Sequence, residues 1–112
     1  MPTAIEVGPE DGLRPQQREA ICGVFRRFPQ VQKAIIYGSR AKGTQRPGSD
    51  IDLTLFGDIN LSTLNQISLA LDDLLLPFEL DLSAFNEIAN PQLREHIQRV
   101  GKLFYAQTNT AT

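Results

Sequence analysis

The chain has 112 residues, which suggests a single domain. A net charge of −2 at pH 7 gives no general electrostatic case for nucleic-acid binding, and no run of about 18 apolar residues is present to span a membrane. Cys22 is the only cysteine, which excludes an intrachain disulfide, and it falls on the core side of a predicted helix. No secretion signal is predicted, so we expect a cytoplasmic protein.

The first half of the chain predicts one helix followed by two strands. Residues 1–10 are rich in Gly, Pro and acidic residues and are expected to be irregular. Pro15 suits the first turn of a helix, Pro29 ends it, and its buried stripe is formed by Ile21, Val24, Phe25 and Phe28. "VQKAIIYG" (31–38) and "SDIDLTLFG" (49–57) predict the two strands.

The second half predicts two helices and two further strands. Asn60 or Ser62 is expected to cap a helix with the apolar stripe Leu61, Leu64, Ile67, Leu71, Leu74 and Leu75. "FELDLSAF" (78–85) predicts the third strand. Asn90 caps a last helix, which faces the core with Leu93, Ile97 and Val100 and for which Gly101 suits the C-terminal cap. "KLFYA" (102–106) predicts an edge strand.

This order of elements predicts an α/β (α+β) fold in which helices flank a small mixed β-sheet. The domain is expected to cover residues 11–106, with residues 107–112 as a flexible polar tail. The sequence alone does not fix the order of the strands in the sheet.

Paired acidic residues on the predicted strands are the first candidates for chemistry. Asp50 and Asp52 share one face of a strand, where like charges about 4 Å apart cost on the order of 4 kcal/mol at an effective dielectric of about 20. Proton sharing, basic neighbours or a divalent cation could offset this cost. Carboxylates suit Mg²⁺. If the second and third strands are neighbours, Asp81 joins the pair, and three carboxylates could hold two Mg²⁺ ions about 3.5–4 Å apart.

The Gly38-Ser39 turn at the end of the first strand is a candidate phosphate-binding element. Gly38 lets a ligand approach the backbone, and Ser39 and the following N–H groups could bind phosphate oxygens. Arg40, Lys42 and Arg46 follow in the loop, where they could neutralise excess phosphate charge. Together with the carboxylates, the turn predicts a site for a magnesium–nucleoside triphosphate complex.

The stretch "GSRAKGTQRPGSDIDL" resembles the motif of the nucleotidyltransferase superfamily of the DNA polymerase β type: Gly-Ser, ten residues, then Asp-x-Asp. The short chain and its later segments are similar to the minimal nucleotidyltransferases, or MNT domains, of that superfamily. The resemblance implies that Gly38 and Ser39 contact the triphosphate and that Asp50 and Asp52 bind the metals. It makes Asp81 the third carboxylate, a metal ligand and a candidate base.

The same resemblance implies a reaction and a partner. Members transfer a nucleoside monophosphate, usually AMP from ATP, to a hydroxyl group and release pyrophosphate. Minimal members are commonly paired with a helical HEPN toxin, so the protein is expected to be the antitoxin of a type VII-like module that adenylylates a toxin tyrosine. Two alternatives stay open. A partner subunit could complete a site for a small-molecule hydroxyl, as in aminoglycoside modification, or the protein could neutralise a toxin by binding alone.

Three further residues are not assigned to the predicted site. Tyr37 is expected to be a packed strand residue rather than a nucleophile. His96 has no second histidine or cysteine at metal-ligand spacing, so a structural role is expected. Glu79 shares a strand face with Asp81, where a role in the site and a solvated role are equally compatible with the pattern.

Overall fold

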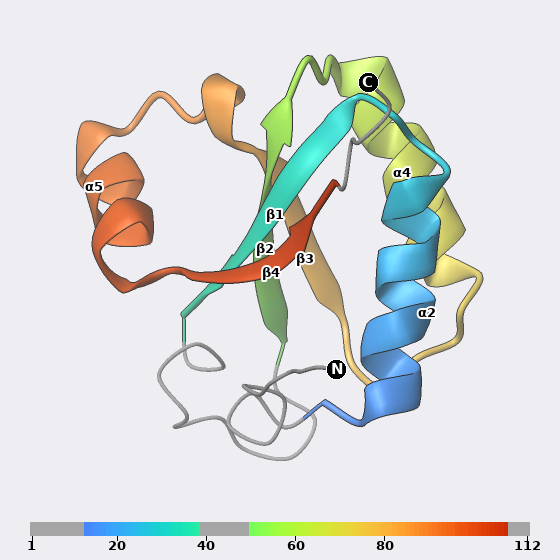
Figure 1. Ribbon diagram of the computed structural model, residues 1–112. Coiled ribbons are helices and arrows are strands. Elements are labelled where there is room, and N and C mark those ends of the chain that lie inside the picture. Colours follow the sequence, from blue (N-terminus) through green and yellow to red (C-terminus); the bar gives the residue numbers. More distant parts are fainter. Residues whose placement is uncertain (1–12, 39–49, 108–112) are drawn as a thin grey trace.

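The computed structural model describes residues 13–38 and 50–107, which form a four-stranded sheet with helices on both faces (Figure 1). The strands are β1 (Val31–Tyr37), β2 (Ile51–Gly57), β3 (Leu80–Ala84) and β4 (Lys102–Ala106). The helices are α2 (Pro15–Arg26), α4 (Leu61–Asp72), α5 (Pro91–Val100) and the short 3₁₀ helix η1 (Phe85–Glu87). The predicted α+β class is confirmed. The predicted irregular segment 1–10 and residues 108–112 of the predicted tail lie outside the described residues.

The sheet is mixed, and its strand order is β3-β2-β1-β4. β1 lies in the middle and pairs antiparallel with β2 on one side and β4 on the other. β2 and β3 pair in parallel, with α4 as the crossover between them. This arrangement supplies the strand order that the sequence left open, and it makes the second and third strands neighbours.

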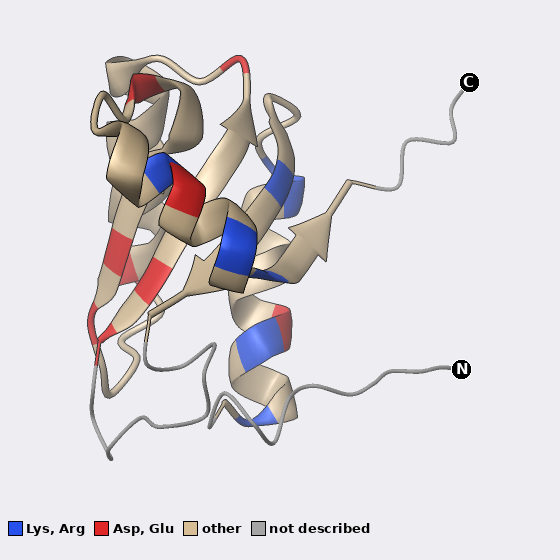
Figure 2. Ribbon diagram, turned by 90° about the vertical axis from the view of Figure 1, so that its left-hand side faces the viewer, with Lys and Arg blue, Asp and Glu red and all other residues tan. Residues whose placement is uncertain are grey.

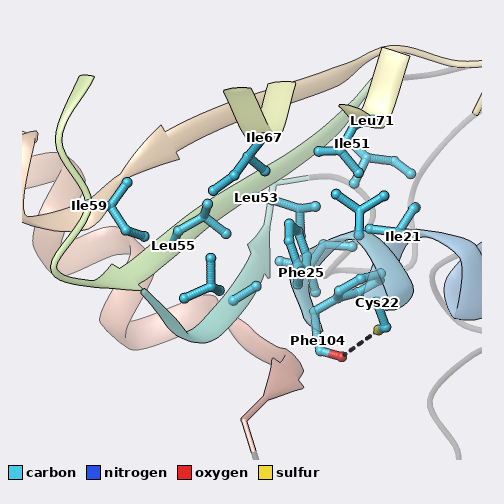
Figure 3. Close-up of a cluster of buried hydrophobic side chains, with 14 of the residues drawn as sticks. Ile21, Cys22, Phe25, Ile51, Leu53, Leu55, Ile59, Ile67, Leu71 and Phe104 are labelled. Atoms are coloured by element: carbon cyan, nitrogen blue, oxygen red, sulfur yellow. Dashed lines mark hydrogen bonds between the residues drawn. The ribbon is translucent and has the colours of Figure 1, made fainter. Parts of the chain in front are cut away.

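Helices α2 and α4 cover one face of the sheet and enclose the main core (Figures 1 and 3). Phe25, Leu53 and Ile67 have no exposed surface. The Cys22 thiol lies 4.0 Å from the carbonyl oxygen of Phe104, and burial raises its pKa. Cys22 is therefore the buried filler that its helical position predicted.

Helix α5 and η1 cover part of the opposite face (Figure 1). Ile97 of α5 is 1% exposed, whereas Leu93 and Val100 are only half-buried. Gly101 follows the helix in extended backbone, with φ −69°, so it is not the left-handed cap that glycine often forms. A Cβ there would collide with the side chain of Ile35 and the carbonyl of Ile97, which means that close packing, rather than turn geometry, requires the glycine.

The predicted stripe of α4 was wrong at its two ends. Leu61 and Leu75 are 70% and 88% exposed. Asn60 caps the helix by accepting a hydrogen bond from the Thr63 N–H at 2.8 Å, so Leu61 falls in the first turn on the outer side. The helix ends at Asp72, before Leu75, which has φ 54°. No helix in the described parts of the chain is long and apolar enough to cross a membrane.

The third strand is shorter than predicted. It begins at Leu80, and Phe85 already belongs to η1. The last described residue, Gln107, continues the pairing of β4 beyond its end. Its N–H donates to the Gln32 carbonyl at 2.8 Å, and its side-chain amide donates to the Pro29 carbonyl at 3.0 Å.

Candidate active site

The face of the sheet that carries α5 presents its side chains in rows that run across β1, β2 and β3. Residues paired in register on neighbouring strands point to the same side of a sheet. The first row is Tyr37, Asp52 and Asp81. The second row is Ile35, Thr54 and Ser83, and the third row begins with Lys33 and Phe56. The face thus changes from carboxylates to hydroxyls and then to aromatic rings beneath η1 and α5. We call the carboxylate end, which no helix in the described parts of the chain covers, the open end of the sheet.

The first row brings two of the predicted carboxylates together. Asp52 and Asp81 are direct partners in the parallel ladder, so their side chains are neighbours on the same face of the sheet. Figure 2, viewed from the α5 side, shows the acidic positions side by side on neighbouring strands. The conditional prediction that Asp81 would fall beside the Asp-x-Asp pair is confirmed.

Asp50 stands just before β2 and is exposed. The next residue, Ile51, donates its N–H to the carbonyl of Glu79 at 2.9 Å, so the chain just before β3 lies alongside the start of β2. Both the Asp50 and the Asp81 charges raise the pKa of Asp52, after the larger effect of its partial burial. The three aspartates therefore interact electrostatically, with Asp52 in the middle.

Gly38 brings the backbone of the predicted phosphate-binding turn against this group. Its φ is +81°, a conformation that side chains with a Cβ rarely adopt. A Cβ at Gly38 would collide with Oδ2 of Asp52, so the carboxylate occupies the space that a side chain would fill. The other residues predicted for phosphate binding, Ser39, Arg40 and Lys42, lie outside the described residues.

The carboxylates suit a divalent cation that binds together with a ligand, rather than one held by protein side chains alone. Among the described residues, no Lys or Arg pairs with Asp50, Asp52 or Asp81, and no group of three acidic, His or Cys side chains forms a ready-made metal cage. Mg²⁺ usually takes only one or two protein carboxylates and fills the remaining positions with water and phosphate oxygens. Asp52 and Asp81 meet that need, and a cation would relieve the repulsion between them.

Hydroxyl groups of β2 and β3 lie in the second row, next to the carboxylates along the strands. Ser83 donates a hydrogen bond to Thr54 at 3.0 Å between their oxygens, and the Thr54 hydroxyl lies 3.5 Å from the Ser83 carbonyl. Tyr37 is the neighbour of Asp52 in the first row, and its partial burial, together with the Asp52 and Asp81 charges, raises its pKa. The sequence pattern missed this connection because Tyr37 joins the site only through the register of β1 with β2.

The sequence profile of the family described as "Polymerase beta, Nucleotidyltransferase" matches residues 19–110, which is most of the chain. The chain belongs to the polymerase β nucleotidyltransferase family. Membership confirms the family resemblance of the Gly-Ser and Asp-x-Asp motif and agrees with the mixed sheet that carries it.

Solved structures share the fold of this nucleotidyltransferase domain at low sequence identity. A toxin–antitoxin structure with AMP-PNP matches at 22% identity and a TM-score of 0.66, over 81% of this chain and 74% of that one. A complex of a tri-AMPylated Shewanella oneidensis HEPN toxin with an MNT antitoxin matches at 17% identity and a TM-score of 0.63, over 85% and 74% of the two chains. Comparison with curated proteins gives no significant match.

Proposed function

We propose that the protein is a magnesium-dependent nucleotidyltransferase that moves AMP from ATP to the hydroxyl of a tyrosine on a HEPN-type toxin, and so acts as its antitoxin. The observation that carries this proposal is the contact of Gly38, Asp52 and Asp81 at the open end of the sheet. A backbone turn with a positive φ and two adjacent carboxylates are brought together there within a polymerase β nucleotidyltransferase fold.

The proposed reaction assigns a task to each element. Asp50, Asp52 and Asp81 would hold Mg²⁺, which neutralises the phosphate charge and polarises the phosphate oxygens. The Gly38 turn would bind the triphosphate through its backbone. The acceptor oxygen forms a bond to the α-phosphorus as the bond to the bridging oxygen breaks, pyrophosphate leaves, and the hydroxyl proton passes to a carboxylate, for which Asp81 is the candidate.

The partner assignment rests on solved structures that share the fold. Several of them are complexes of a toxin with its antitoxin, and in one of them the HEPN toxin carries AMP groups. In the proposed reaction, a partner chain brings its own hydroxyl to the open end of the sheet.

The test is transfer from ATP labelled on the α-phosphate, with Mg²⁺, in the presence and absence of the candidate toxin. We expect the label on a toxin tyrosine, identified by mass spectrometry, and its loss when that tyrosine is changed to phenylalanine. Tight binding to the toxin without any label would leave a binding antitoxin as the function. Labelling of small hydroxyl compounds alone would redirect the assignment to a small-molecule acceptor.

Asp52→Asn is the decisive variant for the site. It removes a charge next to Gly38 and Asp81 without removing core packing, so transfer should fall to background while the fold is kept. Asp58→Asn changes an exposed aspartate after β2 and serves as the matched control. Transfer by Asp52→Asn at the wild-type rate would show that the carboxylates have been misassigned.

A further inference from the structure

Thr54 places a hydroxyl group in the interior, on the sheet face that carries the proposed site. Among the described residues it is the only polar or charged residue that is buried, and it has no exposed surface. A buried hydroxyl is costly unless it is hydrogen-bonded, because it has given up its bonds to water. Thr54 accepts a hydrogen bond from the Ser83 hydroxyl at 3.0 Å and lies at a longer 3.5 Å from the Ser83 carbonyl. The buried hydroxyl is therefore satisfied by one residue of the neighbouring strand β3.

The two hydroxyls lie one step along the strands from the carboxylates. The parallel ladder pairs Thr54 with Ser83 in the same register in which it pairs Asp52 with Asp81. Side chains two residues apart on a strand point to the same face and are separated by about 7 Å along it. Whatever keeps Ser83 opposite Thr54 therefore also keeps Asp81 opposite Asp52.

The register of β3 needs such a restraint because β3 is a short strand at the edge of the sheet. It has five residues, and its only partner in the described sheet is β2. A slip of one residue would turn its apolar side chains away from the core, so the hydrophobic pattern opposes that slip. A slip of two residues is not opposed in this way, because Leu80, Leu82 and Ala84 would still face the core.

The hydroxyl pair disfavours the slip of two residues. Such a slip places either Phe85 or Asp81 opposite Thr54 in place of Ser83. The Phe85 side chain offers no hydrogen bond to the buried hydroxyl, and the Asp81 carboxylate would lose solvation at a buried position. Of the three, Ser83 alone provides a small neutral partner. The pair thus favours the register in which Asp52 and Asp81 lie side by side.

We propose that Thr54 and Ser83 are positioning residues for nucleotidyl transfer, which hold β3 in register with β2 so that Asp81 stays beside Asp52. This inference rests on the proposed nucleotidyltransferase function. It assigns to neither hydroxyl a contact with the nucleotide or the metal. Their effect is on the relative position of the two carboxylates that would share the metal-bound triphosphate.

Two substitutions of Thr54 separate the role of its hydroxyl from that of its packing. Thr54→Val keeps the shape of the side chain and removes the hydroxyl, whereas Thr54→Ser keeps the hydroxyl and removes a buried methyl group. Ile67→Val removes a buried carbon on α4 and serves as the control for lost packing. Each full-length variant is melted and is titrated with Mg²⁺ and AMP-PNP, while the backbone amide shifts of Asp52 and Asp81 are followed by NMR. Steady-state transfer from ATP gives kcat and KM.

We expect Thr54→Val to keep the amide response of Asp52 and to lose most of the response of Asp81. Its kcat should fall on the order of 10-fold to 100-fold, because a displacement of about 1 Å in a reacting group costs up to 100-fold, with little change in the KM for ATP. Thr54→Ser and Ile67→Val should melt at lower temperatures than the wild type, because each loses buried apolar contact. Both should nevertheless keep the two amide responses and the wild-type kcat.

Ser83→Ala tests the other partner of the hydrogen bond. It should reproduce the loss of kcat and of the Asp81 response, and Ser83→Ala combined with Thr54→Val should be no worse than either change alone, because both remove the same hydrogen bond. Ser62→Ala removes an exposed hydroxyl on α4 and should match the wild type in every measurement.

Equal responses of Asp81 in Thr54→Val and wild type, or equal kcat values, overturn the inference. The same holds if Thr54→Ser loses as much activity as Thr54→Val, because packing and not the hydroxyl would then be responsible. A wild-type protein in which neither aspartate responds to Mg²⁺ and AMP-PNP rejects the proposed function, and this inference with it. A wild-type protein that responds but transfers AMP to no toxin rejects only the acceptor, because the amide comparison still decides the role of Thr54 and Ser83.

Discussion

Gly38 is the residue at which backbone conformation and site chemistry meet. Its positive φ and the closeness of Oδ2 of Asp52 exclude any larger side chain without movement of the carboxylate. Gly38→Ala should therefore lower transfer on the order of 100-fold, because a displacement of about 1 Å in a reacting group costs that much. It should also cost about 1–2 kcal/mol of stability, because alanine disfavours the left-handed region.

A second glycine gives the matched control for that substitution. Gly23 lies inside α2, and a Cβ there would meet only the flexible Arg26 side chain at 3.9 Å. Gly23→Ala should leave transfer unchanged and stabilise the protein by about 0.5–1 kcal/mol. Thermal melting and transfer assays of both variants check the pair, and a Gly38→Ala protein as active as Gly23→Ala would contradict the proposed site.

Asp52 links the site to stability through its charge. Its folded-state pKa is raised, first by burial and then by Asp81 and Asp50, so the folded state favours the protonated carboxyl. The resulting contribution to stability is present at acidic pH and is lost as the pH rises through the folded-state pKa. Without metal, Asp52→Asn should melt a few degrees higher than the wild type at pH 7, and the difference should disappear below a pH of about 4.

Calorimetry across pH, with and without Mg²⁺, measures this effect. Mg²⁺ with AMP-PNP should raise the melting temperature of the wild type more than that of Asp52→Asn, because the substitution removes a ligand charge. Asp58→Asn should follow the wild type under each condition. A gain in stability by Asp52→Asn that persists undiminished at acidic pH would mean that charge is not its cause.

At the scale of elements, four stacked side chains lie at the covered end of the sheet face that carries the proposed site. We call them the aromatic column. The Lys33 ammonium lies 4.7 Å from the Phe56 ring centre, Phe56 stacks on Phe85 at 4.4 Å, and the Arg94 guanidinium lies 4.4 Å from the Phe85 ring centre. Arg94 also donates to the Phe85 and Ile88 carbonyls at 3.2 and 3.0 Å. The column thereby joins β1 and β2 to η1 and α5.

Arg94→Ala should destabilise the protein by about 1–3 kcal/mol, because it removes a stacked cation and its hydrogen bonds to two carbonyls. The Phe85 carbonyl keeps the Ile88 N–H as a donor, whereas the Ile88 carbonyl loses the Arg94 donor. Arg99→Ala changes an exposed arginine on the same helix and should alter stability by less than about 0.5 kcal/mol. Chemical denaturation measures both variants. Equal destabilisation by the two would show that helix propensity or net charge, and not the column, is responsible.

Individual elements were largely predictable because their signals are local. Asn90 caps α5 through hydrogen bonds to the N–H groups of Gln92 and Leu93, as the sequence predicted. The exposed ends of the α4 stripe were not predictable in the same way. Whether Leu61 and Leu75 meet the core depends on where the helix starts and stops, and a pattern of leucines carries no such information.

At the scale of the whole molecule, one face of the sheet has an open end, which carries the proposed site, and an end covered by η1 and α5. Gly38, Asp52 and Asp81 lie at the open end, and the aromatic column lies beneath η1 and α5. Mg²⁺ with AMP-PNP should therefore slow amide hydrogen exchange at the C-terminal end of β1 and the N-terminal ends of β2 and β3. Hydrogen-exchange mass spectrometry should detect no comparable change in α5 or β4, and slowing spread evenly over the chain would contradict a local site.

The residues of the proposed site could be selected from the sequence, but their geometry could not be predicted from it. The motif identified Gly38, Asp50 and Asp52 because it is contiguous, and Asp81 could be chosen only on the condition that two strands are neighbours. The row that joins Tyr37, Asp52 and Asp81 depends on the pairing register of three strands. Register arises from long-range packing, so no local sequence pattern connects Tyr37 with the carboxylates.

The parallel pairing of β2 with β3 also determines when the site can form. Asp52 and Asp81 become neighbours only after α4 has crossed over the sheet and β3 has docked, and contacts between such distant segments form late because loop closure costs entropy. A nascent chain that has emerged only as far as α4 therefore lacks part of the proposed metal-binding group. Such a chain should remain inactive on the ribosome until β3 has left the exit tunnel, so synthesis itself would delay the onset of catalysis.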